Sequence, residues 1–158
     1  PFEIFFHEFW HLIDNYAGSG RFGYVSLDRG LGETVKREIM DRVIRIQREM
    51  GFKRRAEAYD ELSRIVRQMY KDDPTVLGGL GDMVQGATAG RACDWGVPNH
   101  SRSYFTGADG LENRSTEAFA EFFECAMANP RALETLREWL PDSYKLFMEI
   151  IHDLAEAL

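Results

Sequence analysis

Apolar residues recur at helical spacing through most of this chain, and this periodicity constrains its fold more than any other feature. Residues 33–50 carry five apolar positions at intervals of four, four, three and four residues: Val35, Ile39, Val43, Ile46 and Met50. Such intervals place side chains on one face of a helix, opposite a face of mixed charge. Residues 55–70 repeat the pattern with Tyr59, Leu62, Val66 and Met69. We therefore predict two long amphipathic helices here.

Other segments are predicted to be helical from their spacing and their capping residues. Residues 2–16 mix apolar intervals of three and four, which predicts a helix buried on more than one face. A shorter helix is predicted for residues 76–84, although its glycines weaken it. Ser115 is a suitable N-cap for a helix that reaches residue 128. Asn129-Pro130 begins the next helix, and Pro141 begins the last.

One segment favours a strand. Residues 21–27 (RFGYVSL) are short and β-prone, and a turn-like Asp-Arg-Gly follows them. Residues 86–113 are predicted to be a long glycine-bearing loop, and loops of that length in compact domains are usually functional or disordered. We find no internal repeat and no linker. Residues 1–158 are therefore expected to form a single, mainly α domain, α+β at most, with a short β segment.

Composition excludes several classes of protein. With 44% apolar and 28% charged residues, the chain is expected to be globular rather than disordered. Its 19 basic and 26 acidic residues give a net charge of -7, which argues against nucleic acid or an anionic membrane as the main partner. No apolar stretch approaches the length of a membrane span. Cys93 and Cys125 lack a CxxC spacing and are expected to be reduced, partly buried thiols.

The strongest chemical signal is the HExxH motif formed by His7-Glu8-Phe9-Trp10-His11. Residues four apart lie on one face of a helix, so both imidazoles can bind one metal ion. Glu8 is rotated by about 100° from His7 and suits the base that deprotonates a metal-bound water. With four histidines in the chain, chance would produce this motif only roughly 0.01 times. Zinc is the expected cofactor, in a catalytic site or, as the alternative, in a structural one.

The third ligand is expected on the helix of residues 115–128. Glu117 and Glu121 stand four residues apart there, within a phenylalanine-rich run. One carboxylate can bind the metal while the other accepts a hydrogen bond from a ligand imidazole. The alternative is a solvated acidic face, but burying glutamates among phenylalanines without a partner costs free energy. We favour the metal-binding interpretation.

The segments HEFWHLIDNYAG (residues 7–18) and TEAFAEFF (residues 116–123) resemble the gluzincin peptidases, the family that includes the catalytic domain of anthrax lethal factor. The resemblance implies a zincin-like helical domain with the active-site helix at the N-terminal end of this chain. It implies three ligands to Zn²⁺: His7, His11 and Glu117. It also implies that Glu8 is the catalytic base. Glu121 and Asp14 are implied to position the ligands without binding the metal themselves.

A second resemblance is to the C-terminal region of phage minor head (head morphogenesis) proteins, and it covers residues 79–105 and 112–144. Those proteins often carry this peptidase-like signature after a head-assembly domain. The resemblance implies a phage or prophage origin, phage head proteins as partners, and a cytoplasmic or virion-associated location. Because the chain begins with Pro1 rather than Met, we expect it to be a fragment of a longer protein.

Further residues follow from the gluzincin resemblance. Relatives place a tyrosine hydroxyl near the metal, in a Ser-Tyr context before the glutamate helix, where it stabilises the oxyanion. Tyr104 is the matching residue, and a packed loop tyrosine is the alternative. His100 is a further transition-state donor or, as we favour, a residue that organises its loop. Trp10 either narrows the cleft or packs, and His152 is expected to be an ordinary helix residue.

These observations predict a zinc metallopeptidase that hydrolyses peptide bonds in a peptide or protein substrate. Zincins lay the substrate along an edge strand that precedes the HExxH helix, yet only six residues precede His7. Either residues 21–27 supply that strand or it lies outside this chain. The competing hypothesis is therefore a phage-derived head-assembly or interaction domain whose zinc is structural or catalytically silent.

Overall fold

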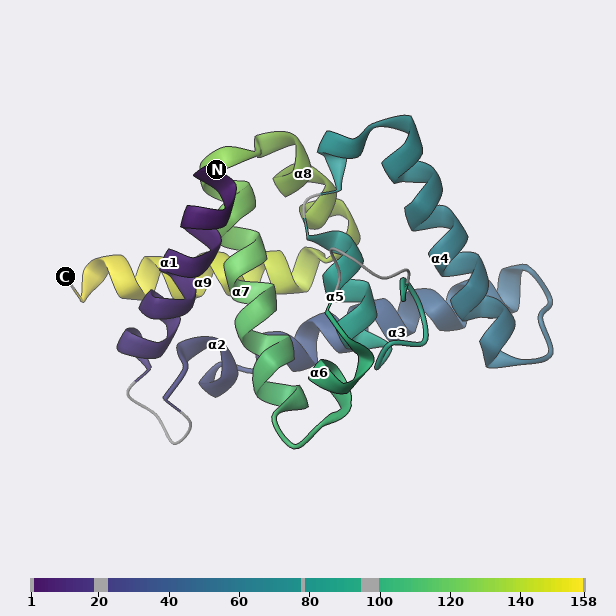
Figure 1. Ribbon diagram of the computed structural model, residues 1–158, viewed down its shortest axis with the longest axis horizontal. Helices are drawn as coiled ribbons and strands as arrows, with labels where there is room; N and C mark the ends of the chain where they lie inside the picture. Colours follow the sequence, from purple (N-terminus) through teal and green to yellow (C-terminus); the bar gives the residue numbers. More distant parts are fainter. Residues whose placement is uncertain (1, 19–22, 78, 95–99, 158) are drawn as a thin grey trace.

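The computed structural model of the protein describes residues 2–18, 23–77, 79–94 and 100–157. These residues form helices joined by turns and loops, with no strand among them (Figure 1). The helices are α1 (Phe2–Ala17), α2 (Val25–Asp28), α3 (Leu31–Glu49), α4 (Arg55–Asp72), α5 (Leu80–Ala87), α6 (Arg102–Thr106), α7 (Gly110–Ala128), α8 (Pro130–Trp139) and α9 (Pro141–Glu156), with a 3-10 turn, η1, at Pro74–Val76. The prediction of a mainly α fold is confirmed. The short β segment is absent from the described residues.

The two amphipathic helices are present as α3 and α4, and their apolar stripes face the core. Val35, Ile39 and Val43 of α3 are completely buried, so that α3 contacts α4, α5, α7 and α9. Met50 does not belong to this stripe, because it is the C-cap of α3 and is 56% exposed. The chain turns away directly after it, at Gly51, whose φ of 67° favours glycine.

Helix α7 runs through the middle of the molecule and contacts α1, α3, α5, α6 and α8 (Figure 1). Phe119 and Phe122 are completely buried, and Phe147 of α9 stacks on Phe122 with the ring centroids 5.2 Å apart. Burying a phenylalanine side chain contributes about 1.5–3 kcal/mol to the free energy of unfolding. The phenylalanine-rich run therefore anchors α7 in the core and gives α1 a rigid surface to lie on.

The prediction of a strand at residues 21–27 is wrong for the part that the structure describes. Val25–Asp28 form α2, and residues 19–22 lie outside the described residues. The physical reason is Asp14 of α1, whose buried carboxylate accepts hydrogen bonds from the backbone N–H of Ser26 at 2.8 Å and from its hydroxyl at 2.5 Å. These bonds hold the start of α2 against α1. The described part of the segment therefore offers no strand edge to a peptide.

The predicted loop of residues 86–113 contains regular structure. Helix α5 continues to Ala87, α6 lies within the segment, and α7 begins at Gly110, while residues 95–99 lie outside the described residues. The predicted helix of residues 76–84 is likewise divided between η1 and α5. Short helices held by tertiary contacts carry little apolar periodicity of their own, so spacing alone did not reveal them.

Ser115 lies inside α7 rather than at its N-cap. Its hydroxyl donates to the carbonyl oxygen of Leu111 at 3.0 Å, one helical turn earlier. Gly32 of α3 packs against it so closely that a Cβ there would lie 2.4 Å from the Ser115 Oγ. This close contact with α3 stabilises the polar first turn of α7, which has few apolar residues.

The caps predicted for the last two helices are confirmed in position. The Asn129 side chain accepts a hydrogen bond from the backbone N–H of Ala132 at 3.1 Å and begins α8, and Pro141 begins α9. Among the described residues, no helix combines the length and hydropathy that crossing a membrane requires.

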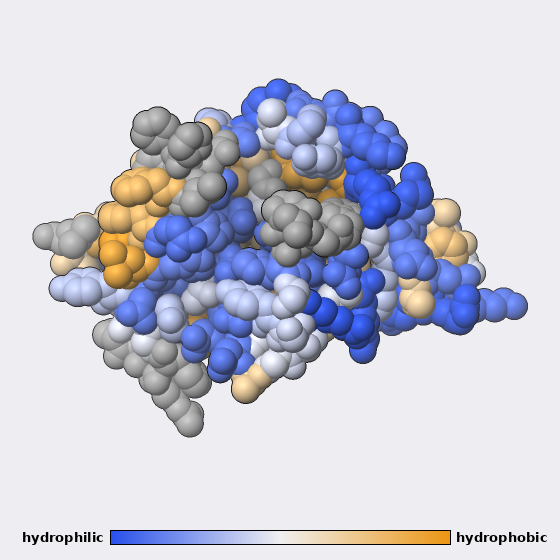
Figure 2. Space-filling view, viewed as in Figure 1, coloured by the Kyte–Doolittle hydropathy of each residue, from blue (hydrophilic) through white to orange (hydrophobic). Residues whose placement is uncertain are grey.

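Helix α1 differs from its prediction in burial. Its described apolar side chains do not bury more than one face, because four of them are exposed: Phe5, Phe9, Leu12 and Tyr16. Figure 2 shows an apolar patch over this part of the molecule. The opposite face of α1 lies on α7 and carries the HExxH histidines.

Candidate metal centre

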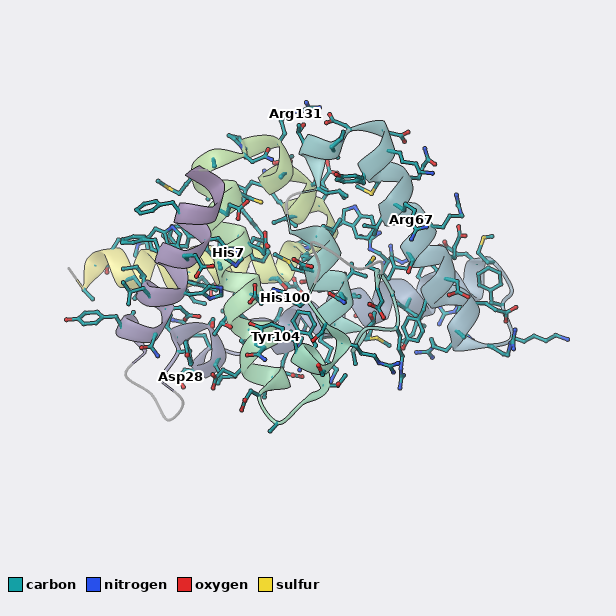
Figure 3. All side chains as sticks on the ribbon, viewed as in Figure 1. His7, Asp28, Arg67, His100, Tyr104 and Arg131 are labelled. Atoms are coloured by element: carbon teal, nitrogen blue, oxygen red, sulfur yellow. The ribbon has the colours of Figure 1, made fainter. Side chains whose placement is uncertain are left out.

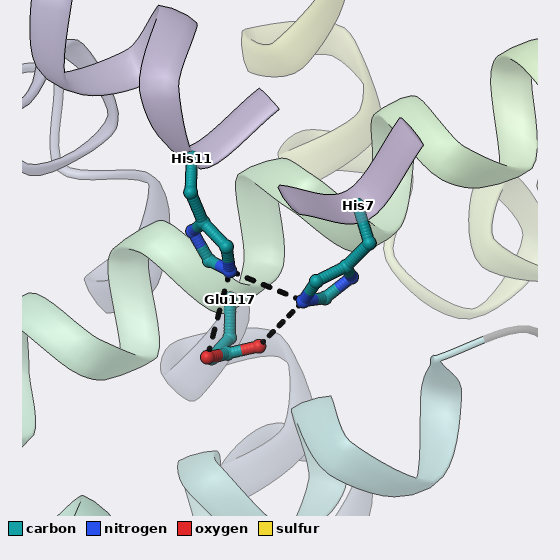
Figure 4. A group of neighbouring side chains, drawn as sticks. All are labelled: His7, His11 and Glu117. Carbon is teal, nitrogen blue, oxygen red and sulfur yellow. Dashed lines mark hydrogen bonds and ion pairs between the residues drawn. The ribbon is translucent and has the colours of Figure 1, made fainter. Parts of the chain in front are cut away.

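His7 and His11 project from α1 towards Glu117 of α7 (Figure 4). The Nε2 atoms of the two histidines are 3.1 Å apart. Glu117 places Oε2 3.2 Å from Nε2 of His7 and Oε1 3.7 Å from Nε2 of His11. One ligand atom from each residue lies within 4.8 Å of the other two. Two helices that are distant in sequence thus bring two imidazoles and one carboxylate to one point.

This arrangement fits a divalent cation. Oε2 of Glu117 is buried and makes no hydrogen bond, in a side chain that is only 6% exposed. The imidazole nitrogens of His7 and His100 lie 3.2 and 3.4 Å from this oxygen, so its negative charge would also balance a cation bound among these groups. Two imidazole nitrogens and one carboxylate are also a donor set that zinc takes in catalytic sites, where a fourth position stays open.

The electrostatics keep Glu117 ionised. Burial alone would raise its pKa, but contacts with His7 and Tyr104 outweigh burial and hold the pKa at about 2. Burial alone would lower the pKa of His7, but Glu117, Glu124 and Glu121 outweigh it and raise that pKa to about 10. Burial lowers the pKa of His11. Glu117 thus lies beside one imidazole whose pKa is raised and one whose pKa is lowered.

Tyr104 of α6 lies at the same point. Its hydroxyl donates to Oε1 of Glu117 at 2.6 Å, and burial together with that carboxylate raises its pKa. Asn113 of α7 donates to the backbone carbonyl of Tyr104 at 2.7 Å and fixes α6 on α7. Tyr104 and Glu117 are thirteen positions apart, so the chain between them folds back and brings the hydroxyl to the carboxylate.

His100 also reaches the cluster. Its ring stacks on Tyr104 with centroids 4.2 Å apart, and its Nε2 lies 3.4 Å from Oε2 of Glu117 (Figure 3). The completely buried Gln85 of α5 donates to the backbone carbonyl of His100 at 2.7 Å. The residue is thus held in its loop and still faces the carboxylate, so the two roles considered for it are compatible.

Glu8 follows His7 on α1 and is exposed. Its charge is close enough to His11 to oppose the fall in that histidine's pKa. The carboxylate is therefore open to solvent and within electrostatic reach of His11.

Two further carboxylates of α7 face the other ring nitrogen of His7. Glu124 places Oε2 3.4 Å from Nδ1, and Glu121 places Oε1 3.7 Å from the same atom. The sequence pointed to Glu121 but not to Glu124. The signal for Glu124 was present, because intervals of four and three from Glu117 put all three glutamates on one face of a helix.

Asp14 does not support the histidines in the way the resemblance implied. Both of its carboxylate oxygens are bonded to Ser26, and its side chain is completely buried at the end of α1. The nearest donors at that end belong to α2 rather than to the cluster. Asp14 therefore fixes the α1–α2 connection.

Asp82 of α5 was missed in the sequence, where it stands in a glycine-rich segment. Its Oδ1 is buried without a hydrogen bond, and burial raises its pKa to about 6. Its charge interacts with His100, Glu117 and His7. The cluster is thus more acidic than the three candidate ligands alone indicate.

The remaining singled-out residues have structural surroundings. Trp10 stacks on Phe123, with ring centroids 3.3 Å apart, and so packs α1 on α7. His152 is exposed on α9, beside Asp153 and Glu156. The two cysteines, Cys93 and Cys125, are buried and form no disulfide.

No family model matches the chain, and no curated protein or solved structure shows significant similarity to it.

Proposed function

We propose that this protein is a zinc-dependent metallopeptidase. The observation that carries the proposal is the meeting of His7, His11 and Glu117, which brings two imidazole nitrogens within 3.7 Å of one buried carboxylate. The HExxH motif and the resemblance to gluzincins in residues 7–18 and 116–123 support zinc as the metal and peptide hydrolysis as the reaction.

The three ligands would hold the zinc ion. When bound, zinc would supply a Lewis acid that polarises a peptide carbonyl and lowers the pKa of water to about 7. Glu8, exposed beside the cluster, takes the proton from the attacking water and gives it to the departing amine. The Tyr104 hydroxyl donates to Oε1 of Glu117 in the structure, and in the reaction it would turn this proton to the oxyanion of the tetrahedral intermediate.

The first test is the zinc content of the purified protein. We expect about one zinc per chain in the wild type and its loss in Glu117→Ala. Glu138→Ala removes the same side chain from an exposed position of α8 and should keep the metal. A wild type that binds no zinc would refute the proposal.

The second test is hydrolysis of an unstructured protein such as casein. Glu8→Gln keeps the shape of the side chain but cannot accept the proton, so we expect it to lose activity by about 100-fold or more while it retains zinc. Activity that survives this substitution would contradict the role of Glu8.

A second candidate function is a phage-derived head-assembly or interaction domain with a silent zinc site. The absence of a strand from the described residues favours it, because a zincin needs an edge strand to hold its substrate. Intact zinc binding without hydrolysis of varied peptides would support this alternative.

A further inference from the structure

His7 is held from two sides. Its Nε2 faces Glu117 and His11, and its Nδ1 faces Glu124 at 3.4 Å and Glu121 at 3.7 Å. The His7 side chain is only 18% exposed, so these neighbours determine the orientation of its ring.

Glu124 is the nearer of the two carboxylates to Nδ1. It lies two turns after Glu117 on α7, and its side chain is 21% exposed. Among the described residues, His7 is the one with which Glu124 forms an ion pair.

Glu121 completes this side of the ring from a more buried position. Its side chain is 10% exposed, and it lies against Gly79 at the start of α5. A Cβ on Gly79 would stand 1.9 Å from the Cδ of Glu121 and 2.0 Å from its Oε2. The glycine thus leaves the space that this carboxylate occupies. Glu124 is nevertheless the nearer carboxylate to Nδ1, at 3.4 Å against 3.7 Å for Glu121.

We propose that Glu124 is a positioning residue that accepts the Nδ1–H hydrogen bond of His7 and so directs Nε2 towards the metal position. A histidine that binds metal through one nitrogen commonly donates its other N–H to a carboxylate, which fixes the tautomer and the ring orientation. This inference rests on the proposed zinc site and adds the residue that orients one of its ligands.

The experiment compares Glu124→Ala and Glu124→Gln with the wild type and with Glu138→Ala, which removes an exposed glutamate of α8. Zinc affinity is measured by competition with a chelator, and circular dichroism checks that each variant is folded. We expect Glu124→Ala to weaken zinc binding by about 10- to 100-fold, the usual effect of losing such a partner. Glu124→Gln keeps a hydrogen-bond acceptor at the same place and should recover most of the affinity.

A second readout does not depend on the metal. In nuclear magnetic resonance spectra of the zinc-free protein, the Nδ1–H proton of His7 should resonate downfield and exchange slowly in the wild type and in Glu138→Ala. In Glu124→Ala this signal should move upfield or disappear.

The outcomes separate this inference from the proposed function. Unchanged affinity and an unchanged His7 signal in Glu124→Ala would overturn the role of Glu124, even if the protein binds zinc. Equal losses in Glu124→Ala and Glu138→Ala would overturn it as well. If the wild type binds no zinc, the proposed function and the positioning role both fail. In that case the Nδ1–H signal of His7 shows only whether Glu124 orients the imidazole ring.

Discussion

Asp14 is a single buried residue with a measurable effect on the pH dependence of folding. Burial raises its pKa from 3.8 to about 6, against the opposing hydrogen bonds from Ser26. The folded state therefore binds the proton more tightly than the unfolded state. The stability that this gives is complete below about pH 4 and is lost as the pH rises through about 6.

Asp14→Asn should remove this loss, because the amide does not ionise and still accepts the hydrogen bond from the Ser26 N–H. Between about pH 4 and 7 the free energy of unfolding of the wild type should fall by about 2–3 kcal/mol relative to the variant. Urea unfolding at both pH values measures the difference. Parallel pH profiles of the two proteins would contradict the assignment to Asp14.

Gly79 is a residue at which a single methyl group should act on the metal centre. Its φ of -79° is accessible to alanine, so Gly79→Ala should fold. The added Cβ would overlap the carboxylate of Glu121, which must move away from His7. We expect zinc binding to weaken by about 10-fold.

A double-mutant cycle with Glu121→Ala tests this interpretation. Once the carboxylate has been removed, the methyl group has nothing to displace, and Gly79→Ala should have little further effect on zinc affinity. Additive losses would show that Gly79 acts by another route.

The sequence led to His7, His11 and Glu117 because helical spacing makes two of them neighbours and a second motif supplies the third. Asp82 and Glu124 could not be ranked in the same way. Asp82 reaches the cluster only because α5 packs on α7. Glu124 is one of many glutamates in the sequence, and only the fold shows that its face of α7 lies against α1. A motif within one helix can be recognised in the sequence, whereas a residue that reaches the cluster through helix packing can be identified only from the structure.

At the scale of elements, Glu38 of α3 holds the first turn of α9 through several hydrogen bonds. Glu38 of α3 accepts hydrogen bonds from the backbone N–H groups of Asp142 and Ser143 at 2.8 and 2.9 Å. It also accepts a bond from the Ser143 hydroxyl at 2.5 Å. N–H groups in the first turn of a helix have no acceptor within the helix, and a negative charge is favourable there.

Glu38→Ala should therefore lower the free energy of unfolding by about 1–3 kcal/mol, because it leaves those donors without an acceptor. Urea unfolding measures the change. Glu49→Ala, which removes an exposed glutamate from the end of the same helix, should change it by less than about 0.5 kcal/mol. Equal effects would show that Glu38 contributes only helix propensity.

The long helices were predictable and the short ones were not. Helices α3 and α4 carry enough apolar positions to define a period, and Asn129 and Pro141 mark where α8 and α9 begin. The segment that forms α2 has the composition of a strand, but the buried carboxylate of Asp14 satisfies its backbone N–H and holds it as a helical turn. The contact between Asp14 and Ser26, twelve positions apart, determines the structure of this segment. Local propensity does not predict such a contact.

At the scale of the whole molecule, α1 is attached to a core that is built largely without it. The buried apolar cluster is supplied by residues from Leu31 to Ile150, and of the described α1 side chains Trp10 packs against it. The candidate ligands lie across this join, two on α1 and one on α7. A metal ion would thus fasten α1 to the remainder of the fold.

Removal of zinc should therefore loosen α1 and leave the core folded. A ligand present at about 100 times its dissociation constant stabilises the state that binds it by about 2.7 kcal/mol, so the amides of α1 should exchange hydrogen on the order of 100-fold faster after chelation. The amides of α3 should keep their protection, because α3 is buried by α4, α5, α7 and α9 rather than by α1. Hydrogen exchange followed by mass spectrometry measures both regions at once, with Glu117→Ala as the control that chelation should not alter. If chelation instead exposes the whole chain, the metal is a structural requirement of the fold, and the head-assembly or interaction domain becomes the better account of the protein.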